Sequence, residues 1–333
     1  MKKVVCFGEL LLRLTPSLSG DWLKNASIPI FVGGAEANVA SALSKWGIST
    51  KYVTAIPDNF LSYQLLDHLH QKGIDTTAIL KNGERIGSYY LPLGADLKNS
   101  EVIYDRENSS FWNLKPGMLD WETILDGADW FHFSAICPAL NQAVADVCEE
   151  ALKVARSKNI SISVDLNYSA KLWQYGKQPS EIMPNLVQYC DLIMGNIWAA
   201  NKILQIPLSE ELNNKTDFLK QASITSETII KNFPQCKSVA NTFRFTGDKH
   251  INYYAVLHDK HKEYVSAEYD TDSIIDKVGS GDCFMAGLIY GYLENHLPQR
   301  IINFSAAAAF RKLFVKGDAT NNTVEDIEAS IIE

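Results

Sequence analysis

Short runs of apolar residues alternate along the chain with longer segments whose apolar residues recur every three or four positions. The first pattern is typical of buried strands and the second of amphipathic helices. Gly47 and Gly73 stand where the first two helical segments end, as glycine commonly does. The predicted strands are Lys3–Phe7, Tyr52–Ala55, Trp130–Ser134, Ile160–Asp165, Leu192–Met194 and Ser238–Asn241, and the predicted helices are Ala35–Trp46, Leu61–Gln71, Gln142–Ser157, Cys283–Leu293 and Arg300–Leu313. This alternation predicts an α/β fold with a largely parallel sheet that is covered by helices on both faces.

Two segments lack the helical period. Trp22–Val32 and Ile86–Arg106 alternate apolar and polar residues and are rich in β-forming residues. Such alternation is typical of a small antiparallel sheet with one exposed face. We therefore expect a small β-sheet lid, formed by about residues 10–32 and 84–113, beside the main sheet. Because no repeat or linker divides the chain, residues 1–333 are expected to fold as a single domain.

Composition and charge limit the kinds of ligand and partner that the chain is expected to bind. The 31 Lys and Arg residues against 39 Asp and Glu residues give a net charge of −8, which argues against nucleic acid. The longest apolar run, Cys283–Leu293, contains two glycines and is far shorter than the roughly 20 residues that span a membrane. Six scattered cysteines without a Cys-x-x-Cys pair favour free thiols in a reducing cytoplasm. The closely spaced histidine pairs lack a third ligand nearby, so no metal site built from protein side chains is expected.

The sharpest local motif is Gly279-Ser280-Gly281-Asp282, directly before a strongly apolar helical segment. Glycines let backbone N–H groups converge on an anion, and a helix N-terminus adds the positive end of its dipole. The motif therefore suits a phosphate group, although on these four residues alone an ordinary helix-capping Asp is slightly favoured. The lysine of a P-loop and the third glycine of a dinucleotide fingerprint are both missing.

Taken alone, each of three further clusters can be explained by ordinary local structure without a ligand. Gly33-Gly34 opens a predicted helix, Asp165-Leu166-Asn167-Tyr168 follows a buried strand, and Tyr104-Asp105-Arg106 ends a lid segment. Ligands bind beyond the carboxyl ends of parallel strands, which is where the second cluster is expected. The third cluster suits a polyhydroxylated acid. The combination favours a ligand site more than any single cluster does.

With these motifs and its early β-rich lid, the chain resembles the ribokinase-like (PfkB) family of sugar kinases, and within it the 2-keto-3-deoxygluconate kinases (2-dehydro-3-deoxygluconokinases). The resemblance extends from Gly8 to about Glu328. It rests on Gly8–Pro16, Gly33–Ala40, Arg85–Tyr89, Val102–Arg106, Asp165–Tyr168, Leu172–Trp173 and Asp276–Asp282. It implies a three-layer α/β/α domain with a mostly parallel central sheet, a small antiparallel lid, and a homodimer that pairs through that lid.

The resemblance also implies an activity, the ATP-dependent phosphorylation of the 6-hydroxyl of 2-keto-3-deoxygluconate with Mg²⁺ bridging the β- and γ-phosphates. Asp282 would be the catalytic base, and the N–H groups of Gly279, Ser280 and Gly281 would form the anion hole. An ordinary carboxyl pKa suffices for such a base, because the hydroxyl becomes acidic only as it bonds to phosphorus. The implied sugar-acid contacts are Gly34, Tyr89, Tyr104 and Arg106, with Asn38 as an addition. The implied ATP contacts are Asn167, Asn196, Thr242 and Arg244, with Asp318 in a C-terminal loop near the adenine or facing the substrate.

Three positions depart from the pattern of these kinases. Ser169 replaces an Arg that grips the substrate carboxylate, and the loss of such a contact costs about 1.5–3 kcal/mol, or roughly ten- to a hundredfold in affinity. Lys171 can supply a point charge there but lacks the planar fork of Arg. Ala199 replaces a Glu that helps to organise Mg²⁺, and Ser280 replaces an Ala. Two alternatives therefore stay open, a PfkB kinase for another sugar such as fructose or a different sugar acid, and a catalytically silent sugar- or nucleotide-binding relative.

Overall fold

Strands and helices alternate through most of the chain, and the computed structural model describes residues 2–18, 20–24, 27–92, 102–246, 250–260 and 262–332. The described strands are β1 Lys3–Phe7, β2 Leu11–Leu14, β3 Ile30–Gly33, β4 Ser49–Val53, β5 Ala55–Ile56, β6 Ile74–Asp75, β7 Leu80–Lys81, β8 Gly87–Tyr90, β9 Ile103–Asp105, β10 Trp130–Ser134, β11 Ser161–Asp165, β12 Leu192–Gly195, β13 Ser238–Thr246, β14 Ile251–Asp259, β15 Glu263–Val265 and β16 Tyr269–Thr271. The described helices are α1 Ala35–Lys45, α2 Phe60–Gln71, α3 Trp121–Ile124, α4 Gln142–Ser157, α5 Pro179–Val187, α6 Ile197–Leu204, α7 Lys215–Asn232, α8 Ser280–Leu293, α9 Pro298–Lys312 and α10 Val324–Glu328, with a 3₁₀ helix at Trp22–Lys24.

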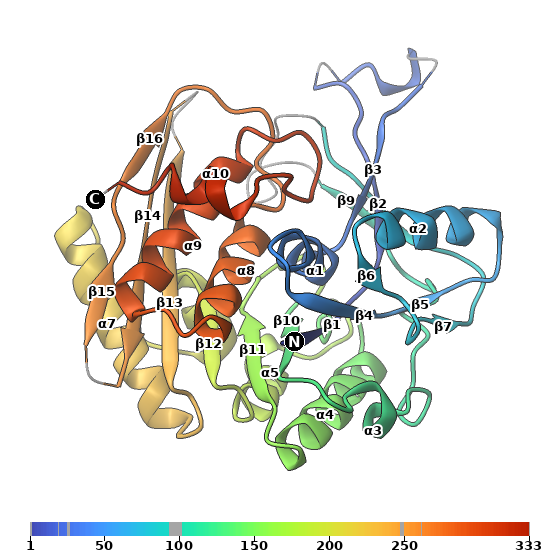
Figure 1. Cartoon of the computed structure of the whole chain (residues 1–333), viewed down its shortest axis with the longest axis horizontal. Coiled ribbons are helices and arrows are strands. Elements are labelled where there is room, and N and C mark those ends of the chain that lie inside the picture. Colours follow the sequence, from blue (N-terminus) through green and yellow to red (C-terminus); the bar gives the residue numbers. More distant parts are fainter. Residues whose placement is uncertain are drawn as a thin grey trace.

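The main sheet contains ten of the described strands, in the order β15-β14-β13-β12-β11-β10-β1-β4-β6 with β16 also paired to β14 (Figure 1). All pairs from β6 across to β13 are parallel. The predicted, mostly parallel sheet is therefore confirmed, and all six predicted strands overlap strands in it. The antiparallel edge formed by β14, β15 and β16 was not predicted from the sequence.

Helices cover both faces of this sheet, and the residues of each central strand alternate between the two cores. In β1, Val4 and Cys6 belong to the core shared with α1, α8 and α9, whereas Val5 and Phe7 belong to the core shared with α4 and α5. This is the period-two alternation of a strand buried on both sides. Helix α8 is apolar around its whole circumference because it packs between α1, α9 and the sheet.

A second, four-stranded sheet forms the predicted lid, in the order β3-β2-β8-β9, and its strands stand apart from the main body in Figure 1. Two of its pairings are antiparallel, but the central pair β2–β8 is parallel. Among the described residues of the predicted segment Trp22–Val32, Trp22–Lys24 form the 3₁₀ helix and only the end, from Ile30, is a strand. Residues 19, 25–26 and 93–101 of the predicted lid lie outside the described residues.

The predicted helix boundaries are close to the observed ones, with one informative difference. Helix α8 begins at Ser280, three residues before the predicted start, so Asp282 lies within its first turn. In the described part of the chain, no helix is both long and apolar enough to cross a bilayer. The single-domain organisation of residues 1–333 stays a prediction.

Candidate active site

Two loops meet backbone to backbone at the start of α8. Gly279 has φ +81°, and a Cβ at this position would lie 1.8 Å from the carbonyl oxygen of Asp318, so only glycine fits. The Ser280 hydroxyl donates a hydrogen bond to the carbonyl oxygen of Ala309 (2.9 Å), which fixes the loop to α9. The first helical bond runs from the Cys283 N–H to the carbonyl oxygen of Gly279 (2.9 Å). The N–H groups that precede Cys283 are those that a helix start offers to a phosphate.

Asp282 lies at this helix start and is 9% exposed. Its Oδ2 accepts a hydrogen bond of 2.7 Å from Nδ2 of Asn38, in the first turn of α1. Burial raises the pKa of Asp282 well above its ordinary value, and the charges of Asp165 and Glu36 raise it further, while the Asn38 hydrogen bond lowers it. The carboxylate is therefore a stronger base than the ordinary Asp expected from the sequence. Asn38, expected as a possible sugar contact, orients this carboxylate.

Asp318 lies on the lid side of the site. Its Oδ2 accepts a hydrogen bond from the Tyr89 hydroxyl (3.0 Å), and it is 2.3 Å from the point that a Cβ on Gly33 would occupy. Burial raises the pKa of Asp318, and the charge of Arg13 acts in the opposite direction. Asp318 therefore lies against Tyr89 and Gly33 of the lid, and its role as a ligand contact stays a prediction.

Two of the residues expected to contact the sugar acid, Arg106 and Gly34, lie against Glu9. Arg106 Nε is 2.6 Å from Oε2 of Glu9, and both side chains are nearly inaccessible to solvent. A Cβ on Gly34 would lie 2.4 Å from the carbonyl oxygen of Glu9. Tyr104 packs against Tyr89 with ring centroids 6.1 Å apart. Glu9 meets only part of the donor capacity of Arg106, because a guanidinium carries five N–H groups.

The segment that follows β11 contains Ser169, which departs from the pattern of the kinases that the chain resembles. Asn167 is exposed and Ser169 is half-buried. Lys171 Nζ donates a hydrogen bond of 2.9 Å to the carbonyl oxygen of Val102, which directly precedes β9. Lys171 therefore joins this segment to the lid. Its role as a substitute for the missing Arg stays a prediction.

The other expected ATP contacts lie on the opposite side of the site from the lid. Asn196 caps α6, where its Oδ1 accepts a hydrogen bond of 2.8 Å from the N–H of Ala199. Thr242 is one residue beyond Asn241, which pairs with the last residue of β12, and Arg244 follows on the same strand. In the sheet, β11 and β10 separate these positions from β1, which leads into the lid. The residues expected to contact the sugar and those expected to contact ATP therefore lie on opposite sides of the ends of the central strands.

The structure also brings together buried charged residues for which the sequence analysis predicted no role. Glu36 accepts hydrogen bonds from the Ser134 hydroxyl and the Cys137 thiol, and burial raises its pKa. Arg13 forms ion pairs with Asp276 and Asp318. Glu36, Arg13 and Asp276 all stand within the motifs that carry the resemblance to sugar kinases, at positions without an assigned role. Their position within these motifs was the sequence signal that could have identified them.

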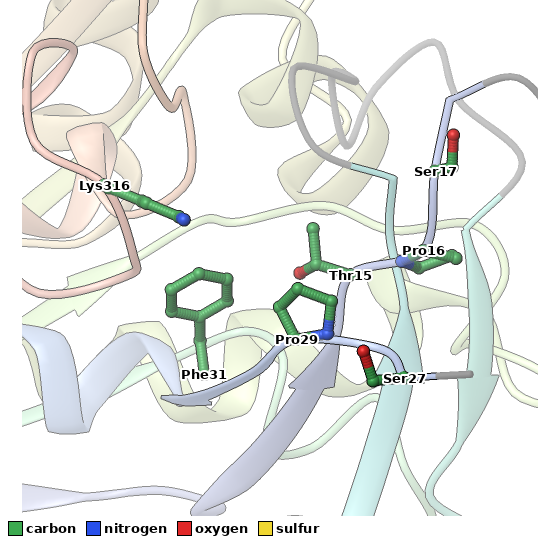
Figure 2. Close-up of a pocket in the computed structure, with 7 residues that line it drawn as sticks. All are labelled: Thr15, Pro16, Ser17, Ser27, Pro29, Phe31 and Lys316. Atoms are coloured by element: carbon green, nitrogen blue, oxygen red, sulfur yellow. The ribbon is translucent and has the colours of Figure 1, made fainter. Parts of the chain in front are cut away.

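A cavity of about 240 Å³ opens where the lid approaches the C-terminal loop (Figure 2). Figure 2 shows Lys316, from that loop, facing Phe31 and Thr15 of the lid. The residues that line it are Thr15, Pro16, Ser17, Ser27, Pro29, Phe31 and Lys316. Phe31 also carries the Arg13 guanidinium on its ring, 4.7 Å from the centroid. Phe31 therefore both lines the cavity and contacts Arg13, whose ion pairs are buried.

Comparisons with known proteins identify the family of the chain. A family model described as pfkB family carbohydrate kinase matches residues 1–324. The 2-dehydro-3-deoxygalactonokinase of Haloferax volcanii is 26% identical over 98% of this chain and 95% of its own. The crystal structure of 2-dehydro-3-deoxygluconokinase from Thermotoga maritima superposes with a TM-score of 0.90 at 36% identity and covers 99% of both chains. A putative ribokinase II from E. coli, solved with ATP and Mg²⁺, shares the fold with a TM-score of 0.76 at 16% identity over 99% of both chains.

Proposed function

The chain belongs to the pfkB family of carbohydrate kinases, and on that premise we propose that it transfers the γ-phosphate of ATP to the 6-hydroxyl of 2-keto-3-deoxygluconate. As a member of this family it is a phosphotransferase with an alcohol group as acceptor. One observation carries the proposal for the site. Asp282 is buried at the start of α8, held by Asn38, and adjoins a glycine loop whose N–H groups suit phosphate.

The chemistry follows from that placement. As the substrate hydroxyl attacks the γ-phosphorus, its proton passes to a carboxylate oxygen of Asp282, and the bond from phosphorus to the bridging oxygen of ADP breaks. The N–H groups of Gly279, Ser280 and Gly281 stabilise the charge on the transferring phosphoryl group. Asn38 holds the carboxylate in one orientation. The raised pKa of Asp282 strengthens the base, provided that the pH is high enough to keep it ionised.

Mg²⁺ enters this proposal bound to ATP, where it would neutralise charge on the β- and γ-phosphates. The described residues contain no cluster of three or more side chains that could hold a metal ion alone. Asp165, at the end of β11, is near enough for its charge to raise the pKa of Asp282. Because Mg²⁺ prefers carboxylate and water oxygens, Asp165 fits the role of its protein ligand. Asn167, Asn196, Thr242 and Arg244 are proposed contacts for the rest of the nucleotide.

The lid side supports a sugar acid as the substrate. Arg106, Tyr89, Tyr104 and Gly34 are the proposed contacts, and two of the similar proteins named above, those of Haloferax volcanii and Thermotoga maritima, are named as kinases of 2-dehydro-3-deoxy sugars. Arg106 keeps donors beyond those that face Glu9, so it can take the carboxylate that the residue at position 169 cannot grip. We include Asp318 here as an acceptor for a substrate hydroxyl, because it lies beside Tyr89.

A homodimer that pairs through the lid is also part of the proposal. Three apolar side chains on or beside the lid strands are largely exposed, namely Leu23 (102%), Ile30 (58%) and Ile103 (50%). A second copy of the chain would bury this surface, which is unusual for a solvated sheet. We further propose a cytoplasmic location, supported by six cysteines that are all free and buried and by the use of ATP.

The substrate is tested with purified protein, Mg-ATP and a coupled assay for ADP. The panel contains 2-keto-3-deoxygluconate, its galacto counterpart and fructose as a neutral hexose. We expect the highest kcat/KM for a 2-keto-3-deoxy acid. Preference for fructose would replace this substrate by a neutral sugar, and ATP binding without ADP formation on any sugar would identify a catalytically silent relative.

A further inference from the structure

Arg13 is a fully buried cation in the lid, and the proposed phosphoryl transfer does not use it directly. Its side chain extends from β2 and is 0% exposed. Nη2 and Nη1 donate hydrogen bonds of 2.6 and 3.3 Å to the two carboxylate oxygens of Asp276. Nε approaches Oδ1 of Asp318 to 2.8 Å as a charge contact, without the alignment of a hydrogen bond. One guanidinium therefore bridges two buried carboxylates.

Those two carboxylates belong to the loops that shape the proposed phosphate site. Asp276 lies three residues before Gly279, and its Oδ1 accepts a hydrogen bond of 3.1 Å from the N–H of Val278. Its Oδ2 accepts another of 3.1 Å from the N–H of Gly317 in the C-terminal loop. The carbonyl oxygen of the next residue, Asp318, touches the Cα side of Gly279. Asp276 thus holds both loops by their backbones while Arg13 holds Asp276.

The lid is connected to the same group through two neighbouring strands. Arg13 on β2 is the register partner of Tyr89 on β8. The Tyr89 hydroxyl donates to Oδ2 of Asp318, while Arg13 faces Oδ1 of the same carboxylate. Phe31 on β3 covers the flat face of the guanidinium. Three of the four lid strands therefore meet the C-terminal loop at this point.

We propose that Arg13 is a positioning residue that joins the lid to the loop before α8 and to the C-terminal loop, so that the lid and the phosphate-binding N–H groups keep one fixed relative geometry. This inference rests on the proposed role of residues 279–282 in holding the transferred phosphoryl group. Its consequence is that a change at Arg13 acts on turnover through loop geometry, although Arg13 touches neither reactant.

The guanidinium is specifically suited to this position. Its planar fork donates to both oxygens of one carboxylate while Nε approaches a second carboxylate, and its face stacks on an aromatic ring. A lysine would keep one charge but could not span both carboxylates. Burial alone would lower the pKa of Arg13, but the charges of Asp318 and Asp276 outweigh this effect and keep it protonated.

The test compares Arg13→Met and Arg13→Lys with a matched control, Arg156→Met. Arg156 also forms an ion pair of 3.0 Å with a buried carboxylate, Asp191, but it joins α4 to the segment before β12, away from the lid. Hydrogen exchange is measured by mass spectrometry on peptides that span residues 274–284 and 313–321. We expect at least tenfold faster exchange in both peptides for Arg13→Met, less for Arg13→Lys, and no change there for Arg156→Met.

Kinetics on a sugar that the wild type accepts provide the second readout. Because a misplacement of about 1 Å costs about a hundredfold in rate, we expect kcat to fall about a hundredfold in Arg13→Met, with KM for ATP changed less than threefold. Arg13→Lys should recover part of kcat, and Arg156→Met should lower thermal stability with kcat retained. Kcat is referred to the concentration of folded enzyme.

Unchanged exchange in both peptides would overturn the proposal, and so would an equal effect of Arg156→Met. If Arg13→Met does not fold, Arg13→Lys and Asp276→Asn decide by the same peptides, and wild-type exchange in both would overturn it. If the wild type phosphorylates no sugar acid, the proposed substrate fails, but the exchange experiment still decides whether Arg13 joins the lid to the loops.

Discussion

Asp282→Asn should remove turnover and at the same time stabilise the folded protein at neutral pH. The structure buries the Asp282 carboxylate with one hydrogen-bond donor, the Asn38 amide, and surrounds it with the charges of Asp165, Glu36 and Asp318. An ionised carboxylate in such a place is tolerated for catalysis and opposes folding. An amide of the same shape removes the charge, and its oxygen can still accept from Asn38.

The expected magnitudes follow from the role and the environment. Loss of a general base lowers kcat by about 10²–10⁴-fold. Removing the charge from a buried group that has too few hydrogen-bond partners should raise the free energy of unfolding by about 1–3 kcal/mol. For a chain of this size, that corresponds to a rise in Tm of several degrees. Because folding raises the pKa of Asp282, its effect on the free energy of unfolding is neutral below the unfolded pKa of about 4. It becomes unfavourable as the pH rises through the folded pKa, so the advantage of Asn should grow with pH.

The assay is a pair of denaturation curves for wild type and Asp282→Asn at pH 4.5 and pH 8, together with kcat at pH 8. Asp120→Asn is the control, because Asp120 is an exposed cap of α3 and the hydrogen bonds that its carboxylate accepts from Thr123 lower its pKa. Asp120→Asn should lose stability at pH 8, whereas Asp282→Asn should gain it. Retained turnover in Asp282→Asn would refute its role as base. A stability difference that is the same at both pH values would refute the buried charge.

Three further predictions concern other residues of the site and the lid. Ser169→Arg should lower KM for the keto acid about ten- to a hundredfold in steady-state assays, because it restores a bidentate contact; an unchanged KM would mean that another cation, such as Lys171, already holds the carboxylate. Asn38→Leu should reduce kcat and shift the acidic limb of the kcat–pH profile upward, because the Asn38 hydrogen bond lowers the pKa of Asp282; a profile identical to that of the wild type would contradict this role. Ile103→Asp, on the exposed face of β9, should convert a dimer to monomers in light scattering, and a dimer that persists would show that the subunits do not pair through this surface.

The sequence predicted the parts of the fold that depend on local pattern. Buried parallel strands such as Leu192–Gly195 are continuous apolar runs, and the Gly-Ser-Gly-Asp motif is readable because its chemistry is contained in four neighbouring residues. The antiparallel strand Ile251–Asp259 was missed because a short apolar run cannot be assigned to strand or helix by pattern alone. The central lid strand was missed because Leu11–Leu14 is short and contains a charged residue.

The rest of the site depends on contacts between distant parts of the chain. Arg13 in a short apolar segment suggests an exposed position, yet it is buried because Asp276, 263 residues away, neutralises it. The raised pKa of Asp282 likewise comes from burial and from carboxylates on other elements. Asn38 could be placed near a glycine pair from the sequence, but its hydrogen bond to Asp282 spans 244 residues. No local pattern contains that information.

We propose that Asp282 is the base in the transfer of phosphate from ATP to the terminal hydroxyl of a 2-keto-3-deoxy sugar acid. The most direct measurement is NMR analysis of the product formed from 2-keto-3-deoxygluconate and Mg-ATP by the wild type, with Asp282→Asn run in parallel. We expect one product with phosphorus coupled to the protons of carbon 6, formed by the wild type and at least a hundredfold more slowly by the variant. Phosphate on another carbon, no product from the wild type, or equal rates for the two proteins would contradict it.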